Sequence, residues 1–112
     1  MSDSSIVIYT SRRQLELYEG NRLIRRYPIA VGKKATPTPH GHYYIAAKHL
    51  HPGGVFGSRW MGLSLPTYGI HGTNSPSSIG QAISKGCIRM HNHDAEALYQ
   101  HVVIGTPVTI QP

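Results

Sequence analysis

One cysteine and one histidine in the middle of this chain could together perform nucleophilic chemistry. Cys87 is the only cysteine, and His71 precedes it in the chain with Gly72 directly behind it. The thiolate is the reactive form of cysteine, and a free thiol is mostly protonated at neutral pH, so a nearby histidine can either accept the proton or, as histidinium, stabilise the thiolate. The pair is therefore typical of nucleophilic catalysis, and backbone N–H groups near Gly86 and Cys87 are candidate oxyanion donors for a tetrahedral intermediate.

The residues around Cys87 favour a reactive thiol over a packing residue. Gly86 lets a substrate approach closely and permits unusual backbone angles. Lys85 and Arg89 carry positive charges, which would lower the pKa of the thiol if they lie near it. The alternative is that Cys87 is a small buried hydrophobe, which is a common role for a lone cysteine.

The elements that must hold these residues are mostly strands. Residues 5–10, 14–18, 23–31 and 42–46 are rich in β-branched and aromatic side chains or alternate in polarity, and shorter strands are expected near 60–61, 68–70 and 108–110. Pro28 cannot donate to a ladder, so its position is expected at an edge or a bulge.

Helical signals occur only in the second half. A short helix is expected within residues 75–83, weakened by Gly80, and a longer one over 92–102 with Asn92 as its cap. In the longer helix an apolar face recurs with helical spacing at Ala95, Leu98, Tyr99 and Val102. The chain is thus predicted to be mainly β, a sandwich or barrel-like sheet with one or two short helices near the C-terminal half.

Composition limits the class of protein. The 112 residues suit one domain, 1–112, which we expect to be a monomer, and 39% hydrophobic with 14% charged residues exclude a disordered chain. No apolar run is long enough to span a bilayer, and residues 1–5 have no signal-peptide pattern. A lone cysteine excludes an intrachain disulfide, and the net charge of +6 favours anionic partners.

Two segments around the cysteine and histidine resemble a known signature. They are Ile-His-Gly-Thr-Asn at 70–74 and Ser-Lys-Gly-Cys-Ile-Arg-Met-His-Asn at 84–92. They resemble the L,D-transpeptidase catalytic domain, or YkuD domain, in which a His-Gly pair is followed by Ser/Thr-x-Gly-Cys-Ile/Val-Arg and often by Asn and Asp. The resemblance extends to residues 29–39 and 56–61, nearly the whole chain, and Lys85 departs from it because many members carry histidine there.

The resemblance implies an enzyme that forms 3→3 cross-links in peptidoglycan and needs no cofactor. Cys87 would attack the third residue of a tetrapeptide stem, and terminal D-Ala would leave. A diamino acid amine of a second stem would then resolve the thioester. His71 would be the base, oriented by the carbonyl of Gly72. Gly86 and Ser84 would shape the motif loop.

Three residues are assigned to the substrate by the same resemblance. Arg89 would order the loop or meet a stem carboxylate, and Trp60 and Asn92 would line the binding site, although Asn92 and Ser84 could instead brace the loop. Residues 48–68 are expected to cover one side of the cleft through Phe56, Trp60 and Met61, unless the last two belong to the core.

Other functions were weighed on the remaining residues. His49-x-His51 and His91-x-His93 have a spacing found in metal sites but lack companion acids or cysteines, so no metal is expected. The basic first third has few aromatic residues between its cations, which disfavours nucleic acid and leaves anionic wall polymers as a partner. An L,D-carboxypeptidase with the same Cys-His pair, and a non-catalytic basic wall-binding domain, remain as alternatives.

The resemblance also implies a location. The substrate of the family lies outside the cytoplasmic membrane, so we expect an extracytoplasmic, cell-wall protein. No export signal is visible in the sequence, which a trimmed leader, a boundary of the expressed segment or a spore context could each explain.

Overall fold

The computed structural model describes residues 3–112, and strands dominate it. In these residues nine strands accompany one α-helix, α1 (Asn92–His101), and two single turns of 3₁₀ helix, η1 (Gly54–Phe56) and η2 (Pro76–Ser78). The strands are β1 (Ser4–Tyr9), β2 (Gln14–Glu19), β3 (Arg22–Gly32), β4 (Gly41–Leu50), β5 (Arg59–Leu63), β6 (Gly69–His71), β7 (Ala82–Ser84), β8 (Ile88–Met90) and β9 (Pro107–Gln111).

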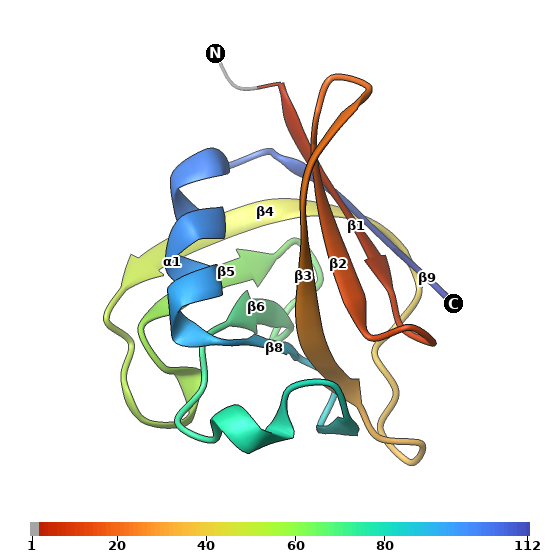
Figure 1. The fold of residues 1–112 in the computed structure, drawn as a ribbon, viewed down its shortest axis with the longest axis vertical. Helices are drawn as coiled ribbons and strands as arrows, with labels where there is room; N and C mark the ends of the chain where they lie inside the picture. Colours follow the sequence, from red (N-terminus) through yellow and green to blue (C-terminus); the bar gives the residue numbers. More distant parts are fainter. Residues whose placement is uncertain (1–2) are drawn as a thin grey trace.

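The sheet closes on itself into a barrel-like ring. Its order is β2-β1-β9-β4-β5-β6-β8-β3-β7, and an additional pairing joins β2 to β3. Eight strands thus form the ring, with β7 added outside β3, and Figure 1 shows them curving around a common interior. Closure removes exposed sheet edges, which is one way that all-β folds avoid edge-to-edge association. The predicted mainly β, barrel-like architecture is confirmed.

Strand β3 closes the ring because it changes partners along its length. Its first part pairs with β2, and this pairing ends where Pro28 stands opposite Gln14. From Ile29 onward it pairs with β8, where Ile29 stands opposite Met90. Pro28, expected at an edge or a bulge, lies where the ladder with β2 ends, and its missing N–H is tolerated there because the strand is changing partners.

A single cluster of buried apolar side chains fills the interior, and α1 covers one side of it. Helix α1 packs on β5 and β6, and the expected apolar face is confirmed: Ala95, Leu98 and Val102 are buried, with Tyr99 packed beside them. The helix passes in front of β5 and β6 in Figure 1. No helix in residues 3–112 is long and apolar enough to cross a membrane.

Two expectations about helices are wrong in detail. Asn92 is the first residue of α1 rather than its cap; His91 holds the cap position, and no side chain caps the helix there. The helix expected within residues 75–83 is only the 3₁₀ turn η2, after which the chain enters β7. Gly80 has φ of +94°, a conformation that interrupts a helix.

Candidate active site

The parallel pairing of β6 with β8 brings His71 and Cys87 to one cavity. In this pairing His71 stands opposite Arg89, and Cys87 immediately precedes β8, two residues before Arg89. Neighbouring strands lie about 4.8 Å apart and alternate residues share a face, so the three side chains converge. They line one cavity of about 310 Å³, together with Val55, Phe56, Ser84 and Lys85.

The imidazole of His71 is held in one tautomer and is neutral. Its Nδ1 bonds the carbonyl oxygen of Gly72, and because a carbonyl only accepts, Nδ1 carries the proton and Nε2 keeps the basic lone pair. The ring is 3% exposed. Burial lowers the pKa of His71 to about 4, which the Gly72 hydrogen bond partly opposes and the charge of Arg89 reinforces.

Two aromatic side chains enclose the His71 ring. Trp60 stands opposite His71 in the β5–β6 register and stacks on it, with ring centroids 5.6 Å apart and an interplanar angle of 18°. Phe56 meets the same ring edge-on at 5.1 Å. Such contacts contribute to stability and exclude water, so they explain both the burial and the orientation of the base.

Trp60 is itself fixed by a pair of glycines. Gly62 and Gly69 face each other across β5 and β6, and the indole lies over both. A β-carbon on Gly69 would come within 2.5 Å of the Trp60 ring, and one on Gly62 within 3.0 Å of its Nε1. The absence of side chains at these two positions therefore lets the indole lie flat against the sheet beside His71.

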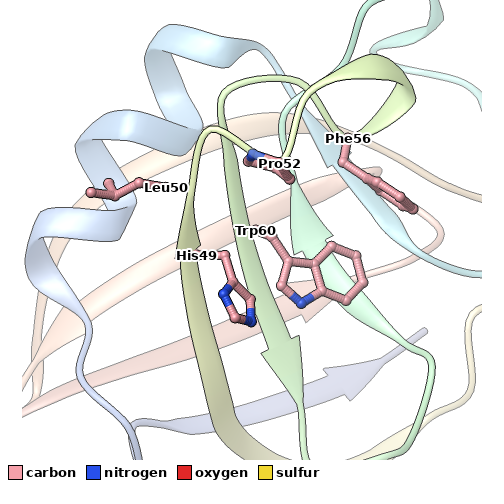
Figure 2. A pocket seen from close by; sticks show the side chains of 5 residues that line it. All are labelled: His49, Leu50, Pro52, Phe56 and Trp60. Atoms are coloured by element: carbon pink, nitrogen blue, oxygen red, sulfur yellow. The ribbon is translucent and has the colours of Figure 1, made fainter.

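A second, apolar groove lies on the other side of this aromatic wall. Its volume is about 400 Å³, and Figure 2 shows the rings of His49 and Trp60 side by side with Phe56 close to the indole. Phe56 lines both this groove and the cavity of Cys87, so it forms part of the partition between them. Leu50 and Pro52 complete the lining.

Residues 48–68, which were expected to cover one side of the cleft, are only partly a loop. Residues 48–50 belong to β4, and β5 occupies 59–63, so Trp60 reaches the site from a strand. Met61 is fully buried in the core and does not line the site. Phe56, 40% exposed in η1, is the residue of this set that a loop supplies.

The thiol of Cys87 is protonated at rest. Burial raises the pKa of Cys87, while a backbone hydrogen bond from Gly69 and the charge of Arg89 act in the opposite direction. Arg89 thus lowers the pKa of Cys87 as expected of a nearby cation, but half-burial of the thiol outweighs its effect, so the pKa is raised overall. Its Sγ lies 3.7 Å from the carbonyl oxygen of Thr67.

Side-chain hydroxyls fix the backbone that carries the cysteine. Ser84 Oγ donates to the carbonyl oxygen of Cys87 at 2.7 Å and accepts from the N–H of Gly86 at 3.0 Å. The N–H of Gly86 is thus engaged, which leaves that of Cys87 as the candidate oxyanion donor. Gly86 has φ of +127°, and a β-carbon there would meet the Tyr68 ring at 2.5 Å, so glycine is required.

Thr38 is a supporting residue that sequence reasoning missed. Its Oγ1 donates to the carbonyl oxygen of Gly86 at 2.8 Å and accepts from the N–H of Gly32 at 2.9 Å. Thr38 is buried and ties the loop after β3 to the cysteine motif. The Thr-Pro repeat at 36–39 was the available signal, but nothing local in it shows the contact across the chain.

Asn92 clamps two loops together instead of facing the cavity. Its Oδ1 accepts from the N–H groups of Ser58 and Thr73, and its Nδ2 donates to the carbonyl oxygen of Thr73. Gly57 and Gly72 leave room for this amide, since a β-carbon on either would meet Oδ1 within 2.2 Å. These hydrogen bonds make Asn92 a brace next to the Gly72 carbonyl that orients His71, which is one of the two roles predicted for it, and its contact with substrate stays a prediction.

The histidines weighed as metal ligands do not converge with other ligands. The rings of His91 and His93 stack with centroids 5.4 Å apart, and His93 Nε2 lies 3.3 Å from Asp94. Within residues 3–112, no group of three His, Cys, Asp or Glu side chains is placed to hold a metal ion.

Comparison with known proteins identifies the family to which this site belongs. A family model for the L,D-transpeptidase catalytic domain, YkuD, matches residues 3–110. The chain therefore belongs to the L,D-transpeptidase catalytic domain family. Proteins that carry the name L,D-transpeptidase YkuD in Bacillus licheniformis and Bacillus subtilis are 53% and 52% identical to it, over 96% and 94% of its length. The chain spans 65% and 64% of these relatives.

Solved structures of the same class share the fold. An L,D-transpeptidase from Mycobacterium smegmatis superposes with a TM-score of 0.88 at 19% identity, covering 99% of this chain and 59% of that one. The catalytic domain of the Enterococcus faecium L,D-transpeptidase gives 0.83 at 25% identity, covering 99% and 98%. The barrel with its covering helix is therefore the fold of this class.

Proposed function

We propose that this chain is the catalytic domain of a peptidoglycan L,D-transpeptidase that forms 3→3 cross-links through a thioester on Cys87. The observation that supports this most directly is the shared cavity of Cys87 and His71, with the imidazole oriented by the Gly72 carbonyl. The proposal extends family membership to a particular reaction, substrate and set of residues.

The neutral pair suits general-base catalysis. His71 Nε2 accepts the thiol proton as Sγ attacks the carbonyl carbon of the third stem residue, and the N–H of Cys87 donates to the developing oxyanion. The same nitrogen returns the proton to the D-Ala amine as the C–N bond breaks. An amine of a second stem then attacks the thioester, its proton passes through Nε2, and the thiol is restored.

The surroundings favour an amine over water as acceptor. Phe56 and Trp60 exclude water from one side of His71, and only a bound amine of suitable shape would be held beside the thioester. The net charge of +6 suits a polymer rich in carboxylates and phosphates, and we place the action of the domain at the cell wall, outside the cytoplasmic membrane.

Incubation with a disaccharide-tetrapeptide tests the reaction. We expect cross-linked dimers and free D-Ala; tripeptide without dimer would indicate the carboxypeptidase alternative.

Mass spectrometry after exposure to a carbapenem tests the nucleophile separately. An adduct should form on the wild type and be absent from Cys87→Ala, and no adduct on the wild type would exclude the thioester route and leave a binding domain. His71→Ala should abolish turnover while the circular dichroism spectrum stays unchanged.

A further inference from the structure

A hollow at one end of the barrel gathers positive charges that have no partner. The turn between β1 and β2 and the loop after β3 meet there, on the side of the molecule away from α1 (Figure 1). The hollow has a volume of about 260 Å³, and Lys33, Lys34 and His40 line it together with Thr10 and Ser11. Within residues 3–112 no ion pair involves any of these residues.

The five acidic side chains of the sequence lie elsewhere in the fold, and none of them lines the hollow. Asp3 and Glu19 belong to the opposite end of the β1–β2 hairpin from its turn. Asp94 and Glu96 are on α1, and Glu16 forms its own ion pair with an arginine of β3. Like charges that gather without counter-charges repel one another, so the hollow suits an anionic ligand that removes this repulsion.

The donors that line the hollow are typical of phosphate recognition. Lysine binds phosphate as a point charge, and serine and threonine hydroxyls are common donors to phosphate oxygens. The bidentate fork that arginine offers to a carboxylate is missing, because no arginine lines the hollow. The Thr10 hydroxyl donates to the carbonyl oxygen of Gln111 at 3.3 Å and lies 3.1 Å from His40 Nε2, so it fixes the imidazole. The Ser11 hydroxyl forms no hydrogen bond within residues 3–112 and is available to a ligand.

The size and surroundings of the hollow favour one unit of a polymer as its occupant. A cavity smaller than about 300 Å³ is too small for most drug-sized molecules but admits one phosphate with its neighbouring atoms. Positive charge continues beyond it, because Arg12 and Arg13 belong to the same turn, and Lys33 donates its N–H to the carbonyl oxygen of Ser84, next to Lys85. No Phe, Tyr or Trp side chain lines the hollow, so nucleic acid bases would find no stacking platform there.

We propose that this phosphate hollow binds a phosphate group of a phosphodiester polymer, which then follows the basic edge toward Lys85. The net charge alone predicts an anionic partner but no surface, whereas the hollow assigns both the surface and the anion. Strand β7 links it to the proposed active site: Ala82 lines the phosphate hollow and Ser84 lines the cavity of Cys87, about 7 Å further along the strand. A polymer held in the hollow therefore keeps the catalytic cavity beside it, through non-covalent contacts that require no turnover.

Calorimetric titration with a synthetic glycerol phosphate oligomer tests the site. The double variant Lys33→Gln/Lys34→Gln should bind about tenfold more weakly, and its slope of log K against log salt should be smaller by about two, because two phosphate contacts are lost. Arg22→Gln/Arg25→Gln removes the same charge from the other end of β3 and should weaken binding by less than about twofold. Equal losses in the two double variants, with circular dichroism showing folded proteins, would mean that net charge alone attracts the polymer and would overturn the site.

Three other ligands, compared at equal charge concentration, identify the anion. Polyglutamate should bind about tenfold more weakly than the glycerol phosphate oligomer, and equal affinity would overturn recognition of phosphate. Equal or tighter binding of oligothymidylate would assign the hollow to nucleic acid and overturn the proposal. Inorganic phosphate should compete weakly; displacement of the oligomer at equal phosphate concentration would mean a site for a single ion and would overturn the polymer as its ligand.

Lysine acetylation mapped by mass spectrometry locates the oligomer on the wild-type chain. Lys33 and Lys34 should become protected when the oligomer binds, whereas Lys48, whose ammonium group is held by carbonyl oxygens of α1 and the residue after it, should react as before. Protection confined to Lys85 would place the polymer in the cavity of Cys87 and overturn the phosphate hollow. Because neither measurement involves turnover, failure of the transpeptidase assay leaves this site standing, and failure here leaves the transpeptidase function standing.

Discussion

At the scale of single residues, burial sets the protonation states of the proposed nucleophile and base. His71 is neutral because burial lowers its pKa to about 4, and Cys87 is a thiol because burial raises its pKa. The rate of iodoacetamide alkylation should therefore keep rising with pH above the ordinary thiol range near 8.5, without a plateau at neutral pH. A plateau reached below pH 7 would contradict the neutral pair and indicate a thiolate–imidazolium pair at rest.

Gly69 should control the aromatic wall through Trp60. An alanine β-carbon there would lie 2.5 Å from the indole, so Gly69→Ala should displace Trp60 and shift the fluorescence emission of this single tryptophan to longer wavelength. We expect a stability loss of about 1 to 3 kcal/mol and slower turnover as His71 loses its stacking partner. Gly62→Ala, with a milder contact at 3.0 Å, is the graded comparison and should change the emission less. Equal effects of the two variants would mean that the indole is not pinned at Gly69.

Asn92 should affect catalysis by positioning a backbone carbonyl. Asn92→Ala removes hydrogen bonds to the backbone N–H of Ser58 and to the backbone N–H and carbonyl of Thr73, so the free energy of unfolding should fall by about 1 to 2 kcal/mol. Because Gly72 then holds His71 less firmly, kcat should drop about tenfold with KM little changed. Asn74→Ala, an exposed asparagine in the same loop, should match the wild type. A rise in KM without a change in kcat would instead indicate that Asn92 contacts the substrate.

The motif made Cys87 and His71 predictable as candidates, and among their supports it offered Ser84 and Asn92 as braces of the loop but not Thr38. Cys87, His71 and the Gly72 carbonyl were foreseeable because the histidine-glycine and glycine-cysteine pairs are contiguous in sequence. The upward shift of the Cys87 pKa was not foreseeable, because the burial of the thiol depends on residues from several strands. Asn92 was predicted as a helix cap, and as either a substrate contact or a brace of the loop; its amide in fact satisfies backbone groups of two distant loops, which no local preference specifies. The Thr38 contact joins residues that only the folded barrel brings together.

At the scale of elements, helix α1 is joined to the sheet by one lysine at its C-terminal end. Lys48 of β4 donates from Nζ to the carbonyl oxygens of Tyr99 and Val102 at 2.8 and 2.7 Å, and it lies 4.0 Å from the centroid of the Tyr99 ring. A cation at this end of a helix satisfies free carbonyls and complements the helix dipole. Its partial burial lowers the pKa of Lys48.

Lys48→Met should therefore detach the end of the helix. The methionine keeps the apolar part of the side chain and removes the charged donor, so the free energy of unfolding in urea at pH 7 should fall by about 2 kcal/mol. Lys34→Met alters an exposed lysine and should change the midpoint little. Amide hydrogen exchange at residues 98–102 should become faster in Lys48→Met. Unchanged exchange there would mean that Lys48 does not stabilise the C-terminal end of the helix.

The elements differ in how far the sequence predicted them. The long strands and α1 follow from β-branched and aromatic composition, alternating polarity and the helical spacing of apolar residues, and these predictions are confirmed. The closure of the ring does not follow from any one segment, because it depends on β3 pairing with β2 over one part and with β8 over another. The short strands β6, which ends at His71, and β8, which directly follows Cys87, have three residues each and are defined by their neighbours more than by their own composition.

At the scale of the whole molecule, the buried imidazole couples stability to pH. The ordinary pKa of His71 is 6.5 and the folded value is about 4, so between these limits the unfolded chain binds a proton that the folded chain does not. Stability from this group is complete above pH 6.5 and is lost as the pH falls through 4. The difference of about 2.5 pKa units corresponds to a loss of about 3 kcal/mol.

Denaturation in urea between pH 7 and 4 measures this coupling. The free energy of unfolding of the wild type should fall across this pH window. In His71→Gln, which cannot bind the proton, the free energy of unfolding should change less steeply with pH, by an amount equivalent to up to one bound proton. Glu16→Gln is the matched control. Burial raises the pKa of Glu16, but hydrogen bonds from Tyr18 and Arg26 together lower it by more, so the net pKa lies below the ordinary value of 4.5. The stability that Glu16 contributes is therefore present above pH 4.5 and is lost below it. Glu16→Gln should therefore keep the slope between pH 5 and 6.5. If His71→Gln keeps that slope too, His71 is not the buried neutral base on which the proposed chemistry depends.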